Sequence, residues 1–127
     1  MQVTRTRRAP LAIALLWGPP IALMAIIFAL SAQPDLSTDL GTVDTILRKL
    51  AHMAEYGLLV FLLWRPFRGL VHERTAIALA FAVALAYAAS DEWHQSLVDG
   101  RHGTPVDVAI DAVGMTVAAL IIRKRVA

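Results

Sequence analysis

The feature that most constrains this chain is a run of 23 residues, from Pro10 to Ala32, without an ionisable side chain. A helix of about 17–25 apolar residues is long enough to cross the hydrocarbon core of a bilayer. The composition of the 127 residues agrees, because 57% are hydrophobic and 17% are charged, whereas soluble domains average about 25% charged residues. The run therefore predicts a membrane-spanning helix.

A cleaved signal peptide is an alternative for this region, because arginines precede an apolar stretch that ends in Ala29-Leu30-Ser31. The apolar core of a signal peptide spans about 7–15 residues, and this run is longer. We therefore favour a permanent first helix.

Three more apolar segments follow, and each carries acidic or polar side chains near one end. Together with the first run they predict helices over residues of about 10–32, 45–64, 75–94 and 105–122. A chain of this length has too few residues for two hydrophobic cores. We therefore expect residues 1–127 to form one all-α domain, a four-helix transmembrane bundle.

The basic residues indicate the orientation of these helices. Nine of the 12 Lys and Arg residues lie before the first helix, between the second and third, or after the fourth, and nine of the ten acidic residues lie at the opposite ends. Lys and Arg in short loops are retained in the cytoplasm. Both termini are thus expected on the cytoplasmic side of a bacterial inner or plasma membrane. Membrane topology and contact with anionic lipids account for the basic residues, so nucleic acid is not an expected partner.

The second segment carries a polar stripe. Lys49, His52 and Tyr56 are separated by three and four residues, which places them on one helix face, with Glu55 beside them. A charged group in the middle of a membrane helix costs about 2.5–3.5 kcal/mol and is found facing protein or water. The stripe must therefore have partners inside the bundle.

The ends of the third and fourth segments carry suitable partners, and Gly114 in the fourth segment would allow close helix approach. We expect these side chains to form one polar site that opens to the outer side. The predicted catalytic residues are His52, Glu55, Asp91 and His94. The predicted ligand-binding residues are Lys49, Tyr56, Glu92, Gln95, Arg101, Asp107 and Asp111.

Some polar and aromatic residues have simpler explanations. Asp107 also fits a capping box with Thr104 and Pro105, which would close the start of the fourth helix. Trp64 and Trp93 are expected in the aromatic belts at the membrane surfaces.

Metal and cysteine chemistry are not favoured. His52, Glu55, Asp91, His94 and Asp111 contain suitable ligand atoms, but His-x-x-Glu is not a zinc pattern and Lys49 would repel a cation. The chain has no cysteine, which excludes disulfides, thiolate sites and cysteine nucleophiles. No metal and no cofactor is predicted.

At these motifs the sequence resembles the VanZ-like family of small integral membrane proteins, named for a member associated with glycopeptide antibiotic resistance. The resemblance covers nearly the whole chain and implies a membrane location and a polar motif set rather than a defined reaction. It rests on Phe28-Ala29-Leu30-Ser31 leading to Pro34, Lys49-x-x-His52-x-x-Glu55-Tyr56, Ser90-Asp91-Glu92-x-His94-Gln95, Gly100-Arg101 and Asp107-x-x-x-Asp111-x-x-Gly114. The family usually has an aromatic residue where this chain has Leu97, and an Asn near Asp111.

Two classes of function fit the polar site. In the first, it binds or acts on an envelope lipid or a cell-wall precursor, with carboxylates and histidines as acid and base and Lys49 and Arg101 holding an anionic group. The resemblance adds a link to glycopeptide-type resistance. In the second, the protein is a noncatalytic membrane component, a proton or ion relay or a partner-binding subunit, whose polar residues form a structural network. Membrane lipids are expected partners in both cases. The residues alone decide neither whether the chain is an enzyme nor its oligomeric state.

Overall fold

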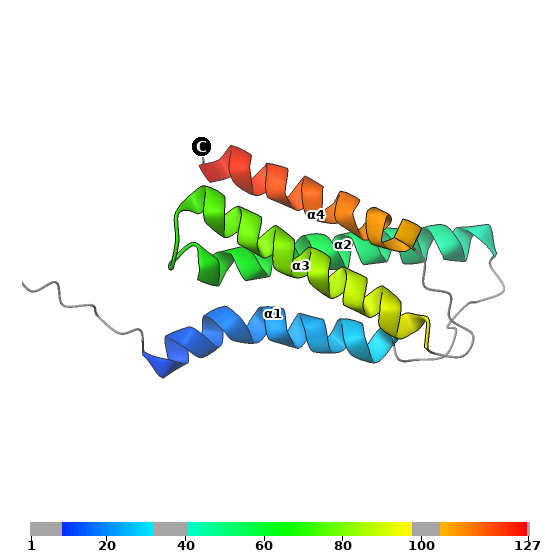
Figure 1. Cartoon of the computed structure of the whole chain (residues 1–127), viewed down its shortest axis with the longest axis horizontal. Helices are drawn as coiled ribbons and strands as arrows, with labels where there is room; N and C mark the ends of the chain where they lie inside the picture. Colours follow the sequence, from blue (N-terminus) through cyan, green and yellow to red (C-terminus); the bar gives the residue numbers. More distant parts are fainter. Residues whose placement is uncertain (1–8, 32–40, 98–104, 127) are drawn as a thin grey trace, which may run out of the picture.

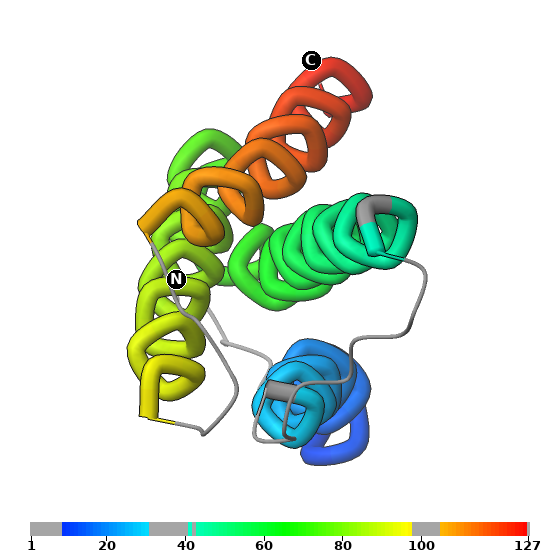
Figure 2. Tube along the Cα trace, turned by 90° about the vertical axis from the view of Figure 1, so that its right-hand side faces the viewer, coloured from blue at the N-terminus to red at the C-terminus, as the bar shows by residue number. Residues whose placement is uncertain are grey.

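The computed structural model describes residues 9–31, 41–97 and 105–126, which form four α-helices running alternately in opposite directions (Figure 1). Helix α1 covers Pro10–Ser31, α2 Thr42–Phe67, α3 Glu73–Gln95 and α4 Pro105–Val126. The predicted all-α four-helix architecture is confirmed. Seen end-on, α2 lies between α1 and α4, with α3 beside them (Figure 2), and α2 packs against all three of the other helices.

Helix α2 is longer than predicted at both ends. It begins at Thr42 rather than near residue 45 and ends at Phe67 rather than near residue 64. The carboxylate of Asp44 lies in the first turn, where negative charge is favourable, and it pairs with Arg48 one turn later at 3.2 Å. Charged residues mark the edge of an apolar segment without ending its helix, so the apolar length underestimates the helix. For the same reason α4 continues through three basic residues to Val126.

Three helices, α1, α3 and α4, are long and apolar enough to cross a membrane. Helix α2 is less apolar, because Lys49, His52 and Glu55 lie in its first half. It runs beside α3 and α4 at the centre of the bundle (Figures 1 and 2). The three apolar helices thus pack around α2, and Lys49 and His52 on the polar face of α2 contact α4.

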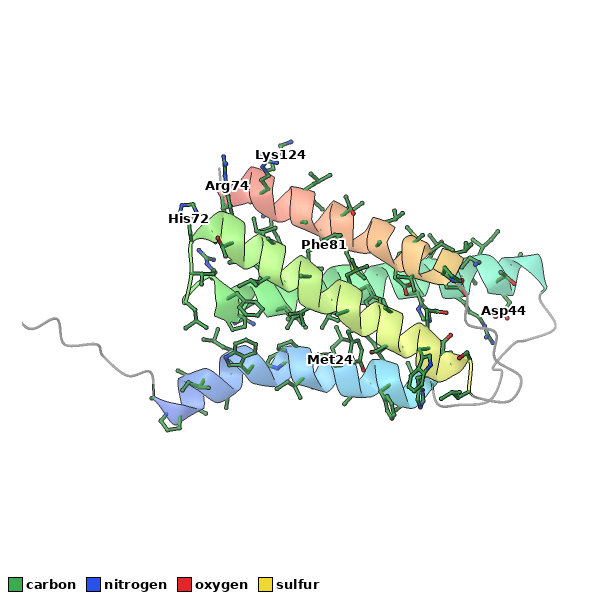
Figure 3. The ribbon with its side chains drawn as sticks, in the orientation of Figure 1. Met24, Asp44, His72, Arg74, Phe81 and Lys124 are labelled. Atoms are coloured by element: carbon green, nitrogen blue, oxygen red, sulfur yellow. The ribbon has the colours of Figure 1, made fainter. Side chains whose placement is uncertain are left out.

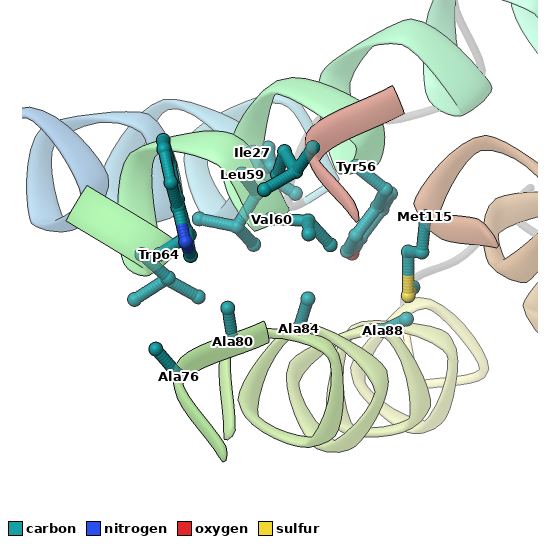
Figure 4. Packing of buried hydrophobic residues seen from close by; sticks show 12 residues of the cluster. Ile27, Tyr56, Leu59, Val60, Trp64, Ala76, Ala80, Ala84, Ala88 and Met115 are labelled. Atoms are coloured by element: carbon teal, nitrogen blue, oxygen red, sulfur yellow. The ribbon is translucent and has the colours of Figure 1, made fainter. Parts of the chain in front are cut away.

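A row of alanines on α3 forms one side of the apolar core. Ala76, Ala80, Ala84 and Ala88 recur every fourth residue and are fully buried. Figure 4 shows them facing the larger side chains of α2, among them Leu59. Small residues let membrane helices approach closely, so van der Waals packing holds α3 on α2.

Charged side chains gather at the two ends of the bundle. Figure 3 shows Arg74 and Lys124 at one end and Asp44 at the other. Within the described segments, the basic end holds Arg65, Arg68, Arg74, Arg123, Lys124 and Arg125. The polar end, formed by the starts of α2 and α4 and the end of α3, holds most of the acidic residues.

Candidate functional site

The buried faces of α2, α3 and α4 change from apolar to polar near the same end of the bundle. On α3 the alanine row is followed by buried Asp91, Glu92 and Gln95. On α4 the buried face begins with Asp111 and continues through Met115. The fully buried Tyr56 marks the change on α2. Three helices therefore place polar groups into one region of the core, which we call the polar cluster.

Two ion pairs join α2 to α4 in this region. The Nζ of Lys49 lies 3.3 Å from the Oδ1 of Asp107, and both side chains are partly exposed. One turn deeper, the Nδ1 of His52 lies 3.3 Å from the Oδ1 of Asp111. Because α2 and α4 run in the same direction, successive turns stay in register and the two pairs form a ladder.

The backbones of α2 and α4 approach each other closely just below these pairs. A Cβ added to Gly114 would overlap the carbonyl oxygen of Met53, and one added to Gly57 would lie 3.1 Å from the carbonyl oxygen of Gly114. The close approach expected at Gly114 is therefore present. It brings the short side chain of Asp111 within reach of His52.

A hydrogen-bonded group joins α2 to α3. The hydroxyl of Tyr56 donates to the Oδ2 of Asp91 at 3.2 Å. The amide Nε2 of Gln95 donates to the same oxygen at 3.4 Å. Both donors are neutral, so these two contacts stabilise the buried carboxylate through uncharged dipoles and not through a positive charge.

Three buried polar atoms of the cluster have no hydrogen-bond partner in the described part of the chain. They are the Oδ1 of Asp91, the Nδ1 of His94 and the Oδ2 of Asp111. The His94 ring packs on Phe28 of α1, with 4.5 Å between ring centroids, so α1 borders this side of the cluster. Since buried polar atoms in proteins are nearly always paired, these three are positions where water or a ligand group would bind.

A comparison with protein families is decisive at this point, because the VanZ/LLP1 family model matches residues 13–126. The chain belongs to the VanZ/LLP1 family. The resemblance inferred from the motifs is thereby confirmed. No curated protein and no solved structure matches this VanZ/LLP1 protein.

The structure of the VanZ/LLP1 chain brings most of the predicted site residues together. His94 packs against Phe28, and seven others make the polar contacts described above: Lys49, His52, Tyr56, Asp91, Gln95, Asp107 and Asp111. Glu55 is half-buried on α2, within electrostatic range of His52 and Asp111. Glu92 is buried next to Asp91. Arg101 lies outside the described residues. The catalytic or binding role of each residue stays a prediction.

The alternative explanations of two features can now be compared with the structure. Asp107 does lie in the first turn of α4, as a capping residue would, and it also pairs with Lys49; Thr104 of the predicted capping box lies outside the described residues. Across the described segments, no group of three or more His, Asp or Glu side chains is arranged to hold a metal ion.

The basic end of the VanZ/LLP1 bundle contains a contact network that the sequence analysis missed. Trp64 is only 7% exposed and donates from its indole Nε1 to the Oε2 of Glu73 at 3.2 Å. Arg68 lies over the indole ring, 4.5 Å from its centroid, and 3.8 Å from Glu73. Trp64 was expected in an aromatic belt at the membrane surface; the structure shows its ring buried and its N–H paired with the Glu73 carboxylate. In the sequence, Glu73 is an isolated acidic residue among the basic residues of this end, and this pattern could have indicated that it has a partner there.

Proposed function

We propose that this VanZ/LLP1 protein binds the polar headgroup of an envelope lipid or a cell-wall precursor at its polar cluster. One observation carries the proposal: Asp91, His94 and Asp111 each keep a buried polar atom that has no hydrogen-bond partner among the described residues. Neighbouring contacts hold two of these side chains in place, from Tyr56 to Asp91 and from His52 to Asp111. A ligand would therefore meet preorganised groups, which reduces the entropic cost of binding.

An acid or base step at this site would use His52. Its side chain is 31% exposed, while the Asp111 side chain that holds its Nδ1 is 2% exposed. A carboxylate on one ring nitrogen orients the imidazole and leaves the other nitrogen for proton transfer. Binding alone requires no such step, and His52 is the residue whose substitution separates binding from turnover.

The proposed orientation places the polar cluster toward the outside of the bacterial plasma membrane. The six basic residues at the opposite end support it, because basic ends of membrane helices are retained in the cytoplasm. A headgroup of the outer leaflet or a cell-wall precursor would then have direct access to the cluster.

Lipid retention tests the proposal. The protein is reconstituted in nanodiscs of mixed envelope lipids, and native mass spectrometry measures which lipids remain bound after release. We expect Asp111→Asn to reduce selective retention, because it removes a charge from the cluster while keeping its shape. Glu73→Gln at the basic end is the matched control. Equal retention by both variants and the unchanged chain would contradict the proposal.

A second function, a noncatalytic structural network, is favoured by the cross-helix pairs themselves. Lys49–Asp107, His52–Asp111 and Tyr56–Asp91 each tie α2 to a neighbouring helix. In a purely structural network, substitutions of these residues would lower the yield and the unfolding temperature and leave lipid selectivity unchanged. The nanodisc measurement therefore distinguishes the two functions.

We also propose the link to glycopeptide-type resistance that the resemblance implies. The test is expression in a glycopeptide-susceptible bacterium, followed by the minimum inhibitory concentration. The unchanged chain should raise it, and His52→Ala, at equal membrane abundance, should not. No rise with the unchanged chain would count against this role.

A further inference from the structure

Asp91 shows which ligand chemistry the polar cluster can accept. Asp91 is 4% exposed, and among the described residues its side chain accepts hydrogen bonds from two neutral donors, the Tyr56 hydroxyl and the Gln95 amide. Within residues 9–31, 41–97 and 105–126, no Lys, Arg or His forms an ion pair with it. Burying a charged group is costly unless it is paired, and Asp91 has no cationic partner among the described residues.

The three buried atoms without partners among the described residues can all accept hydrogen bonds. An ionised carboxylate only accepts hydrogen bonds, so the free oxygens of Asp91 and Asp111 both require donors. The unpartnered Nδ1 of His94 accepts as well when the ring is neutral with its proton on Nε2. A primary ammonium group brings three N–H donors and one positive charge.

The basic side chains on this part of α2 are already engaged. Lys49 is 3.3 Å from Asp107, and Arg48 is 3.2 Å from Asp44. An anionic ligand group would have to displace one of these carboxylates and would then approach Asp91. These contacts therefore do not favour the expectation that Lys49 holds an anionic group of the ligand.

We infer that Asp91, His94 and Asp111 recognise a primary ammonium group, as carried by an aminophospholipid headgroup or an amino sugar. The inference rests on the proposed headgroup-binding function and names its ligand class. Asp91 lies four residues before the end of α3, and Asp111 six residues after the start of α4. These offsets place the carboxylates roughly 6–9 Å inside the helix ends.

Three lipids that differ in their headgroups test this inference on the full chain in nanodiscs. Phosphatidylethanolamine has an ammonium with N–H donors, phosphatidylcholine has the same charge without such donors, and phosphatidylglycerol has hydroxyls without a cation. Native mass spectrometry should show phosphatidylethanolamine retained at least about tenfold over the other two, as expected for charge-assisted hydrogen bonds. Asp91→Asn should abolish most of this preference, and Glu73→Gln should keep it.

The outcomes separate the two proposals. Equal retention of phosphatidylglycerol and phosphatidylethanolamine, both reduced by Asp111→Asn, would overturn the ammonium inference and leave the headgroup site standing. An unchanged preference in Asp91→Asn would also overturn it.

Retention of none of the three lipids by the folded chain would remove the lipid form of the site. Binding of free glucosamine in that case would support a soluble ammonium ligand, and its failure to bind would overturn both proposals. If Asp91→Asn does not fold, the comparison of lipids on the unchanged chain still decides.

Discussion

His52 on α2 and Asp111 on α4 form an ion pair with 3.3 Å between Nδ1 and Oδ1. The pair joins residues 59 positions apart at the place where the α2 and α4 backbones come closest, next to Gly114. A short aspartate can reach the ring there only because the α4 backbone carries no side chain at that contact. The polar cluster therefore depends on the close packing of α2 against α4 at Gly114.

The first prediction concerns Gly114. Gly114→Ala should destabilise the bundle by about 2–4 kcal/mol or prevent its assembly, because overpacking against rigid backbone is costly and the new Cβ would overlap the Met53 carbonyl. Thermal unfolding in detergent measures the effect. Gly18→Ala is the control, since a Cβ at Gly18 meets nothing within 4 Å, and Gly57→Ala should fall between them. Equal unfolding temperatures for all three variants would show that the helices do not cross there.

The second prediction is energetic coupling between His52 and Asp111. In a double-mutant cycle of His52→Ala and Asp111→Ala, the coupling should be about 1–3 kcal/mol, because the carboxylate is buried. The more exposed pair of Lys49 and Asp107 provides the comparison, with about 0–1 kcal/mol expected for a partly exposed ion pair. Denaturant unfolding of each variant gives the free energies. Additive effects at His52 and Asp111 would contradict the observed pair.

The third prediction concerns the Tyr56 hydroxyl. Tyr56→Phe should cost about 1–3 kcal/mol of unfolding free energy, because the buried Asp91 loses a hydrogen bond. Tyr87→Phe is a matched comparison: its hydroxyl donates to the Met24 carbonyl of α1 from a half-buried position, and a smaller loss of about 0.5–1.5 kcal/mol is expected. The ranking of the two losses in equilibrium unfolding checks the difference in burial.

The fourth prediction separates two contacts of Glu73 at the basic end. Glu73→Gln should change the unfolding free energy by less than about 1 kcal/mol, because the amide oxygen can still accept from Trp64 and the ion pair with Arg68 is exposed. Glu73→Ala should cost about 1–3 kcal/mol, since the indole N–H loses its acceptor. Equal losses for Glu73→Gln and Glu73→Ala would show that the ion pair is the main contact.

The fifth prediction concerns the direction of the helices in the membrane. The chain has no cysteine, so single cysteines report position without background. In intact cells, Leu97→Cys at the polar end should react with a membrane-impermeant maleimide, and Leu70→Cys at the basic end should react only after lysis. Both side chains are exposed. The reverse pattern would place the polar cluster in the cytoplasm.

Several features of this protein follow from the sequence alone. The first helix was placed to within a residue, because an uncharged run of this length has one stable conformation in a membrane. The segregation of charge and the stripe of Lys49, His52 and Tyr56 follow from local spacing, which helix geometry converts directly into position. The membrane class and the family motifs could also be recognised from the sequence, because they depend on local composition and spacing.

Only the tertiary structure decided which side chains meet. The pairing of His52 with Asp111, and of Tyr56 with Asp91, depends on the register between helices, and that register comes from the glycine contact between α2 and α4 and the alanine row on α3. The burial of Trp64 was decided in the same way. Spacing along a helix determines the face on which a residue lies, whereas its partner is determined by how closely and at what level two backbones pack.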